Sequence, residues 1–190
     1  MLRAFVCACV FAVCLGSFAV QATAQEVVHA LTGTVSSIDD TAKTITLFQD
    51  NGSQSIFNDI GGSRTRYSLD KKVAAGTTAV NGFNKNGAYV IVFYFGNDDN
   101  RTAVALKNLG TGPFTSAVGT VAKFEGRTHT ISVSDTSGAV QTFKINAETV
   151  AEGSLGVVEG FKFQAEKGDR VRVVSTTVDG SPTALFLSAM

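Results

Sequence analysis

The chain contains no tryptophan, and cysteine, histidine and proline are all scarce among its 190 residues. The three cysteines, Cys7, Cys9 and Cys14, all lie near the N-terminus. A chain processed after residue 24 therefore has no disulfide, no thiol nucleophile and no thiolate metal ligand. It has to be stabilised by a hydrophobic core, which a chain of this size can form.

The shortage of histidine and methionine also limits soft-metal chemistry. His29 and His129 are the two histidines, and Met190 is the methionine that remains once Met1 is removed. Copper and zinc sites are built largely from cysteine, histidine and methionine side chains. The two halves of the chain resemble each other, as described below, and His129 in the second half aligns with Lys43 in the first. A position that accepts such different side chains is typical of a solvated residue at a strand end, which is how we interpret His129. We expect no bound transition metal and no cofactor.

Neither sign of charge dominates. The chain has 16 basic and 16 acidic residues, and removal of Arg3 with a leader would leave 15 basic residues against 16 acidic ones. The sequence also contains no basic run. This balance argues against nucleic acid and against anionic membrane surfaces as partners.

One apolar run stands out, and it lies at the N-terminus. Residues 1–24 are predicted to be a signal peptide, with Arg3 as the positive region, residues 6–20 as the apolar region and Ala22-Thr23-Ala24 as the cleavage pattern. The run is about fifteen residues long, whereas a bilayer crossing needs roughly twenty, so a signal peptide is favoured over a membrane anchor.

Processing at this site would begin the mature chain at Gln25. Lipid attachment at Cys14 is a weaker alternative, because Phe11-Ala12-Val13 lacks the leucine usually found three positions before such a cysteine. We therefore expect an exported protein, periplasmic or extracellular, with no membrane span after processing.

The most informative pattern present is an internal repeat. Glycine, threonine and apolar residues of the first half recur in the second half at nearly constant spacing. Gly33-Thr34-Val35 and residues 44–47 recur 86 positions later, as Gly119-Thr120-Val121 and residues 130–133, while residues 102–106 recur 81 positions later as residues 183–187. The change of offset means about five more residues in the middle of the first copy, where loops absorb length at little cost.

Apolar and polar residues alternate along most of the chain, and helical periodicity is almost absent, which predicts strands. A short helical or loop crossover is expected at residues 146–153, between the third and fourth strands of the second copy. The expected strands are residues 27–38, 44–49, 54–58, 89–95 and 102–107 in the first copy, and residues 118–124, 130–134, 140–145, 169–174 and 183–188 in the second.

Three strands, a crossover and two closing strands are the order of a small OB-like barrel. We predict an all-β protein of two tandem small OB-like five-stranded barrels, the alternative being one larger β-sandwich. The predicted domains are residues 25–108 and 117–190, joined by a linker at residues 109–116.

These motifs also carry a family resemblance. Gly-Thr-Val, Thr-Ile-x-Val, a glycine before a phenylalanine-containing strand, Gly-Asp-Arg-Val-Arg-Val and Thr-Ala-Leu-x-Leu together resemble the secreted bacterial OB-like domains of unknown function. The resemblance covers residues 117–190 well and residues 30–107 more loosely. It implies a small β-barrel in an envelope or extracellular setting, and it supplies no catalytic residues.

Few residues suggest chemistry. Residues 96–100 form the densest group of oxygen ligands, and Asp98 and Asp99 are the calcium candidates, although the same residue types are usual in turns. Gly153-Ser154-Leu155-Gly156 lacks the spacing of a serine-hydrolase elbow. Gly61-Gly62-Ser63 lacks the following lysine and helix of a phosphate loop. We identify no catalytic residue.

The most unusual segment is the strand at residues 89–95, because both of its faces are apolar or aromatic. Such a strand is buried on both sides or prone to aggregation. We favour packing of its outer face on the second barrel, with Phe93 in the barrel interior and Tyr94 on the outer face. The functional alternative is a binding surface formed by Tyr89, Phe93, Tyr94 and Phe95.

The sequence thus favours a secreted, non-catalytic binding or structural module of the bacterial envelope or exterior. Its expected partner is an unidentified protein or envelope polymer. The alternative is an envelope-directed hydrolase acting on sugars or peptides, which would need a pair of carboxylates across a cleft.

Overall fold

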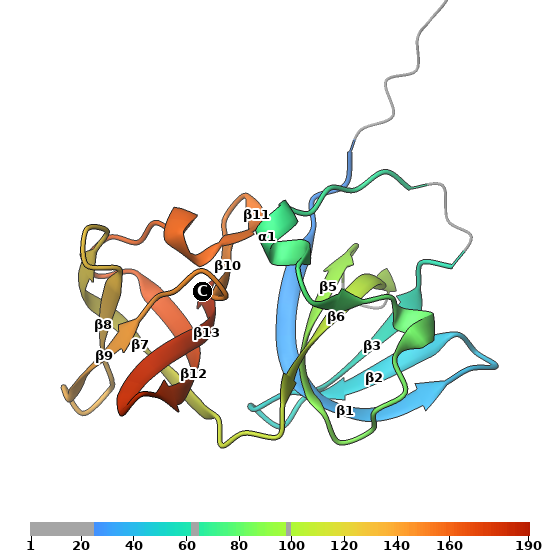
Figure 1. Ribbon diagram of the computed structural model, residues 1–190, viewed down its shortest axis with the longest axis horizontal. Helices are drawn as coiled ribbons and strands as arrows, with labels where there is room; N and C mark the ends of the chain where they lie inside the picture. Colours follow the sequence, from blue (N-terminus) through green and yellow to red (C-terminus); the bar gives the residue numbers. More distant parts are fainter. Residues whose placement is uncertain (1–24, 62–64, 98–99) are drawn as a thin grey trace, which may run out of the picture.

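The computed structural model describes residues 25–61, 65–97 and 100–190, and it is almost entirely β (Figure 1). The predicted signal peptide and the calcium candidates Asp98 and Asp99 lie outside the described residues. The first sheet contains β1 (His29–Asp39), β2 (Thr44–Phe48), β3 (Gln54–Asp59), β4 (Thr77–Thr78), β5 (Tyr89–Phe95) and β6 (Thr102–Gly110). The second contains β7 (Thr115–Glu125), β8 (Thr130–Ser134), β9 (Val140–Lys144), β10 (Val150–Gly153), β11 (Gly156–Glu159), β12 (Arg170–Val178) and β13 (Ser181–Ala189).

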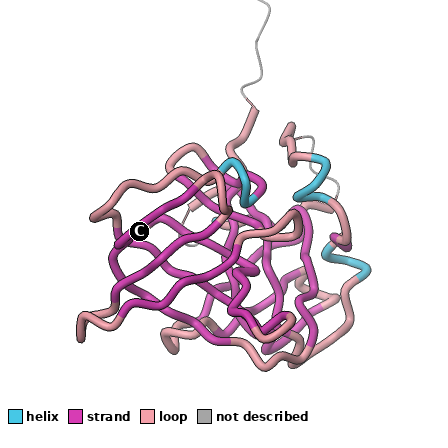
Figure 2. The backbone as a smooth tube through the Cα atoms, turned by 60° about the vertical axis from the view of Figure 1, so that its left-hand side comes forward, coloured by secondary structure: helices cyan, strands magenta, loops and turns pink. Residues whose placement is uncertain are grey.

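Helical structure in the described part of the chain is short. It includes α1 (Lys71–Ala74) and the 3-10 turns η1 (Val80–Gly82) and η3 (Gly160–Lys162). Figure 2 colours these short helical segments cyan among the magenta strands and pink loops. None of the described helices is long and apolar enough to cross a bilayer.

Each sheet closes into a five-stranded OB-like barrel. In the first, the strand order is β3-β2-β1-β5-β6, and parallel pairing of β3 with β6 closes the ring. In the second, the order β9-β8-β7-β12-β13 is closed in the same way by parallel pairing of β13 with β9. The two sheets share no strand pairing among the described residues, so the larger sandwich does not form.

Two details differ from the prediction. First, β6 extends to Gly110 and β7 begins at Thr115, so both strands run into the predicted linker. Second, residues 146–153, expected to be a short helix or a loop, form a turn followed by the strand β10. The Asn146 side chain accepts hydrogen bonds from the N–H groups of Glu148 and Thr149 and forms a turn, after which β10 pairs with β13.

One glycine in each barrel lets the first strand change partners. β1 pairs with β5 up to Thr34 and with β2 from Thr34 onward, and β7 changes from β12 to β8 at Thr120. A Cβ on Gly33 would lie 2.7 Å from the carbonyl oxygen of Phe48. A Cβ on Gly119 would lie 2.2 Å from the carbonyl oxygen of Ser134. Glycine therefore permits this close strand crossing.

Three apolar clusters form the core. One fills each barrel, and the third lies between the barrels, where Val150, Val174 and Phe186 of the second barrel join residues of β1, β5 and β6. The outer face of β5 is thus covered by the second barrel.

The predicted orientation of β5 is wrong. Val90 and Val92 line the first barrel, whereas Phe93 is fully buried in the cluster between the barrels. Tyr94 packs on the barrel interior, with its ring 5.1 Å from that of Phe57. Alternation cannot tell the inner face of a strand from the outer one when both are apolar.

Candidate functional site

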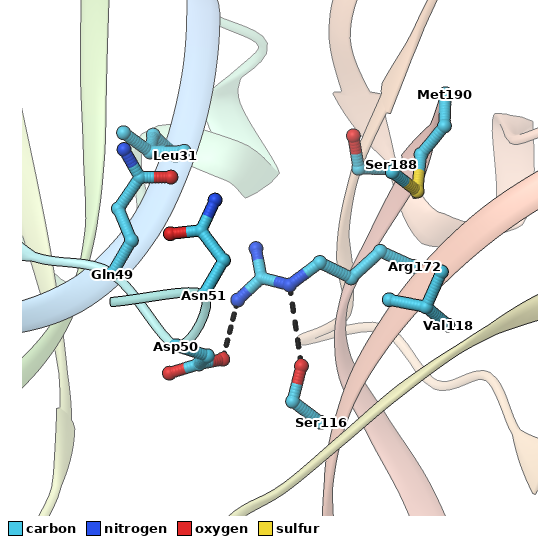
Figure 3. A pocket seen from close by; sticks show the side chains of 9 residues that line it. All are labelled: Leu31, Gln49, Asp50, Asn51, Ser116, Val118, Arg172, Ser188 and Met190. Atoms are coloured by element: carbon cyan, nitrogen blue, oxygen red, sulfur yellow. Dashed lines mark hydrogen bonds and ion pairs between the residues drawn. The ribbon is translucent and has the colours of Figure 1, made fainter. Parts of the chain in front are cut away.

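A cleft of about 520 Å³ opens where the two barrels meet (Figure 3). Its lining combines amide, hydroxyl and charged groups with apolar side chains. The first barrel contributes Leu31, Gln49, Asp50 and Asn51, and the second contributes Ser116, Val118, Arg172, Ser188 and Met190. The site therefore depends on both halves of the chain.

Arg172 crosses this cleft from β12 toward the turn between β2 and β3 (Figure 3). Its guanidinium lies 2.5 Å from the carboxylate of Asp50, and its Nε donates a hydrogen bond of 3.2 Å to Ser116 Oγ. The Arg172 side chain is 15% exposed, so the pair is partly shielded from water. Such charge-assisted hydrogen bonds are stronger than those between neutral groups.

Tyr89 completes this polar group. Its hydroxyl donates a hydrogen bond of 2.8 Å to Asp50, and its ring stacks on Phe114 at 5.0 Å between centroids. Burial raises the pKa of Tyr89 to about 12, so the phenol stays protonated and remains a donor. The Asp50 carboxylate thus has two partners already and is poorly placed to act as a free base.

A second polar group lies elsewhere on the interface. His29 Nδ1 lies 2.9 Å from Glu152 Oε1, and the other carboxylate oxygen accepts a 3.3 Å hydrogen bond from Ala30 N–H. Burial raises the pKa of Glu152 despite these partners. The ring of Tyr94 lies 5.8 Å from that of His29, and the guanidinium of Arg101 lies 5.6 Å from the centre of the Tyr94 ring.

A third group joins α1 to the second barrel. Glu159 lies 2.9 Å from the ammonium of Lys72 and 3.1 Å from that of Lys162, and Lys162 also contacts Asp70 at 2.8 Å. Hydrogen bonds from Lys72 and Lys162 hold the pKa of Glu159 below its usual range. Asp70 is the N-cap of α1, and its side chain accepts a hydrogen bond from Lys72 N–H. The same side chain therefore caps α1 and connects it to Lys162 of the second barrel.

The predicted aromatic site is split by the structure. Phe93 is buried between the barrels, Tyr89 and Phe95 pack around the same cluster, and Tyr94 belongs to the first barrel. Phe93 would meet a ligand only if the barrels separated. A ligand-binding role for these four residues stays a prediction, and of them only Tyr89 is bonded to a residue lining the cleft, Asp50.

The two histidines have different surroundings. His129 has a φ of 50°, and Lys43, its counterpart in the first copy, has a φ of 57°. The His129 side chain is exposed, and its ring lies 4.3 Å from that of Phe161. In the described part of the chain no three His, Cys, Asp or Glu residues are grouped so as to hold a metal ion.

Sequence reasoning did not identify the pair formed by Arg172 and Asp50 or the pair formed by His29 and Glu152. Asp50 and Arg172 are separated by 122 positions, and no local motif links them. One signal in the sequence could have drawn attention to Arg172, namely a difference between the two copies. The two arginines of the Arg-x-Arg pattern in β12 align with Tyr89 and Ile91 of the first copy.

Comparison with known proteins adds no assignment: no family model matches the chain, and no curated protein matches it either. A functional assignment therefore rests on the geometry of the site.

Proposed function

We propose that the chain is an exported, non-catalytic binding or structural module of the bacterial envelope or exterior. The resemblance to secreted OB-like domains and the signal-peptide pattern of residues 1–24 support the setting. The two barrels support binding, because OB-like barrels bind oligomers on their surfaces.

The cleft around Arg172 carries this proposal. Gln49, Asn51 and Ser188 line it with amide and hydroxyl groups, which donate and accept hydrogen bonds without carrying charge. Leu31 and Met190 add apolar surface. A few polar groups on apolar walls are typical of binding sites. The chemistry suits a polar, uncharged stretch of an envelope polymer.

The hydrolase alternative has less support. Glycosidase chemistry needs two carboxyl groups facing one cleft. Among the residues that line the cleft between the barrels, Asp50 has the one acidic side chain, and Arg172 and Tyr89 already contact it. Glu152, whose pKa is raised, is bonded to His29 instead of facing this cleft.

Ser188→Tyr tests the proposal by filling the cleft. Purified peptidoglycan sacculi serve as the probe in a sedimentation assay with the chain from residue 25 to residue 190. We expect the wild type to cosediment and Ser188→Tyr to lose at least tenfold in binding. Thr177→Tyr, an exposed position on the same β12–β13 ladder, is the matched control and should bind normally.

Absence of wild-type binding to sacculi and to other envelope fractions would contradict a binding role for the cleft. Equal binding by Ser188→Tyr would place the site elsewhere. Release of soluble sugar or peptide fragments from the sacculi would instead favour the hydrolase.

A further inference from the structure

The first strand of each barrel has an open edge at its beginning. β1 has β2 as a neighbour only from Thr34 onward, and β7 has β8 as a neighbour only from Thr120 onward. Before these residues, each strand is paired on one side by β5 or β12, and no second strand of its own sheet pairs on the other side in the described part of the chain. An open edge is a template for pairing with a further strand.

In the first barrel this edge is covered by the second barrel. Val157 N–H of β11 donates a 2.9 Å hydrogen bond to the carbonyl of Val28, and the Glu152 carboxylate accepts from Ala30 N–H. Val35 N–H bonds to Ala88, on the β5 side of the strand. Because successive residues direct their backbone groups to opposite sides, Val28 and Ala30 face away from β5, toward β11.

No segment of the described chain covers the equivalent edge of the second barrel in this way. Eighty-six positions after Val28 and Ala30 stand Phe114 and Ser116. Val121 bonds toward β12 through Asp169, as Val35 bonds to Ala88, so the backbone groups of Ser116 and Val118 face away from β12. No other described strand pairs with them.

A groove of about 360 Å³ runs along this edge. Residues of β7 form one wall, and the β8–β9 hairpin forms the other. The lining residues are Thr115, Ser116, Ala117, Val118, Val133, Asp135, Ala139, Val140 and Gln141. Val118 is 40% exposed and Val140 is 60% exposed, so each wall presents an apolar side chain to the groove mouth.

We propose that this edge of β7, from Thr115 to Gly119, docks an extended polypeptide segment of a partner protein as an added strand. Main-chain hydrogen bonds would provide affinity, and Val118 and Val140 would contact alternate side chains of the partner. A polypeptide is the occupant because a polypeptide, β11, already covers the equivalent edge of the first barrel.

The cover of the first barrel also indicates the chemistry of the partner. Residues 150–159 combine valines with glutamates, and one of those glutamates accepts the outward N–H of Ala30. Arg170 is exposed and lines an adjoining hollow together with Val118, Thr120 and Asp135. The Asp135 carboxylate already accepts hydrogen bonds from the N–H groups of Ser137 and Ala139, which leaves the Arg170 guanidinium as the charge offered to a partner. The segment that fits the β7 edge is therefore apolar with an acidic residue. This inference does not depend on polymer binding in the cleft around Arg172.

The probe is a fluorescent synthetic peptide with the sequence of residues 150–159, titrated with the chain from residue 25 to residue 190. Fluorescence anisotropy should show saturable binding. Val140→Asp places a charge in the groove without touching a backbone bond, and we expect it to weaken binding at least tenfold. Val178→Asp is the matched control, because Val178 is 44% exposed and is not among the groove residues, so its affinity should stay within twofold.

A second variant tests the backbone bond. Ser116→Pro removes an N–H that faces the groove, and proline is tolerated on edge strands where the N–H faces away from the ladder. It also removes the hydroxyl that Arg172 contacts, so Ser116→Ala, which removes the hydroxyl alone, is its control and should bind the peptide normally. We expect at least tenfold weaker binding by Ser116→Pro too. If Ser116→Pro does not fold, the Val140→Asp result decides.

The proposal is overturned if the wild type shows no saturable binding, or if Val140→Asp binds as tightly as the wild type. Unchanged binding by Val140→Asp would also be found if the peptide bound by displacing β11 from the first barrel instead of entering the groove. Equal weakening by Val178→Asp would show a general charge effect and would overturn the proposal as well.

Discussion

At the scale of single residues, two glutamates of one interface have pKa values shifted in opposite directions. Burial dominates at Glu152 and favours its neutral form, whereas hydrogen bonds from Lys72 and Lys162 dominate at Glu159 and favour its charged form. The pKa of a group in the native state determines how its contribution to stability depends on pH. The two residues therefore stabilise the native state over different ranges of pH.

The free energy of unfolding of Glu152→Gln should increase relative to that of the wild type as the pH rises from about 4 to 7. A raised pKa means that Glu152 contributes stability below the unfolded value of about 4.3, and that this contribution is lost as the pH rises through the folded pKa. Glutamine does not titrate and can still bond to His29. Urea unfolding at several pH values measures the difference, and a difference that falls with pH would contradict the prediction. The exposed Glu166→Gln is the control.

A second residue-scale prediction concerns Gly119. An alanine Cβ there would lie 2.2 Å from the carbonyl oxygen of Ser134 and 2.7 Å from the side chain of Val133. We expect Gly119→Ala to lower the free energy of unfolding by about 1–3 kcal/mol or more, as overpacking does. Gly126→Ala is the control, because its Cβ would meet nothing within 4 Å. Equal stability of the two variants in urea would show that the strands move apart freely.

At the scale of elements, β5 serves two cores. Val90 and Val92 line the first barrel, while Ile91 and Phe93 pack against the second. Its counterpart β12 alternates charged and apolar residues, and its Arg172 reaches Asp50 near one end of β5. The difference between the two copies is therefore what makes a specific interface between the barrels instead of two independent domains.

Phe93→Ala should loosen both barrels at their contact. A buried phenylalanine truncated to alanine costs about 3–5 kcal/mol, and here the cavity would open between the barrels. Hydrogen exchange in the intact chain should therefore speed up in β5 and in β10 and β13. Leu106→Ala, inside the first barrel, is the comparison, and its effect should stay within that barrel. Unchanged exchange in β10 and β13 of Phe93→Ala would show that the barrels are not coupled through this cluster.

At the scale of the whole molecule, polar groups surround an apolar contact. Arg172 with Asp50, His29 with Glu152, and Glu159 with two lysines each join the first barrel to the second. The apolar cluster supplies the buried area between the barrels, and the polar groups define how one barrel is oriented on the other. Acid should weaken this arrangement at Glu159, whose pKa Lys72 and Lys162 hold below its usual range.

The stability difference between the wild type and Glu159→Gln should shrink as the pH falls below about 4. A lowered pKa means that Glu159 contributes stability above its unfolded value of about 4.3 and loses that contribution as the pH falls through the folded pKa. Denaturant unfolding of both proteins from pH 7 to pH 3 measures this. A difference that grows toward acid would contradict the ion-pair role. Glu166→Gln again serves as the control.

Much of the fold was predictable from the sequence, because alternation and repetition are local or periodic signals. The segments 89–95 and 130–134 match β5 and β8, and the order of three strands followed by two gave the barrel class. The paired φ values of Lys43 and His129 agree with the alignment of the two copies. Repeated glycines and apolar residues carry this information directly, since each is required by its own strand or turn.

The tertiary structure alone decided the orientation of β5 and the identity of the cleft. Both faces of β5 are apolar, so the pattern of residues could not show which face entered the barrel. The partners Asp50 and Arg172, and His29 and Glu152, lie more than a hundred positions apart. Such pairs are set by how one barrel rests on the other, and a single sequence carries no local signal for that contact.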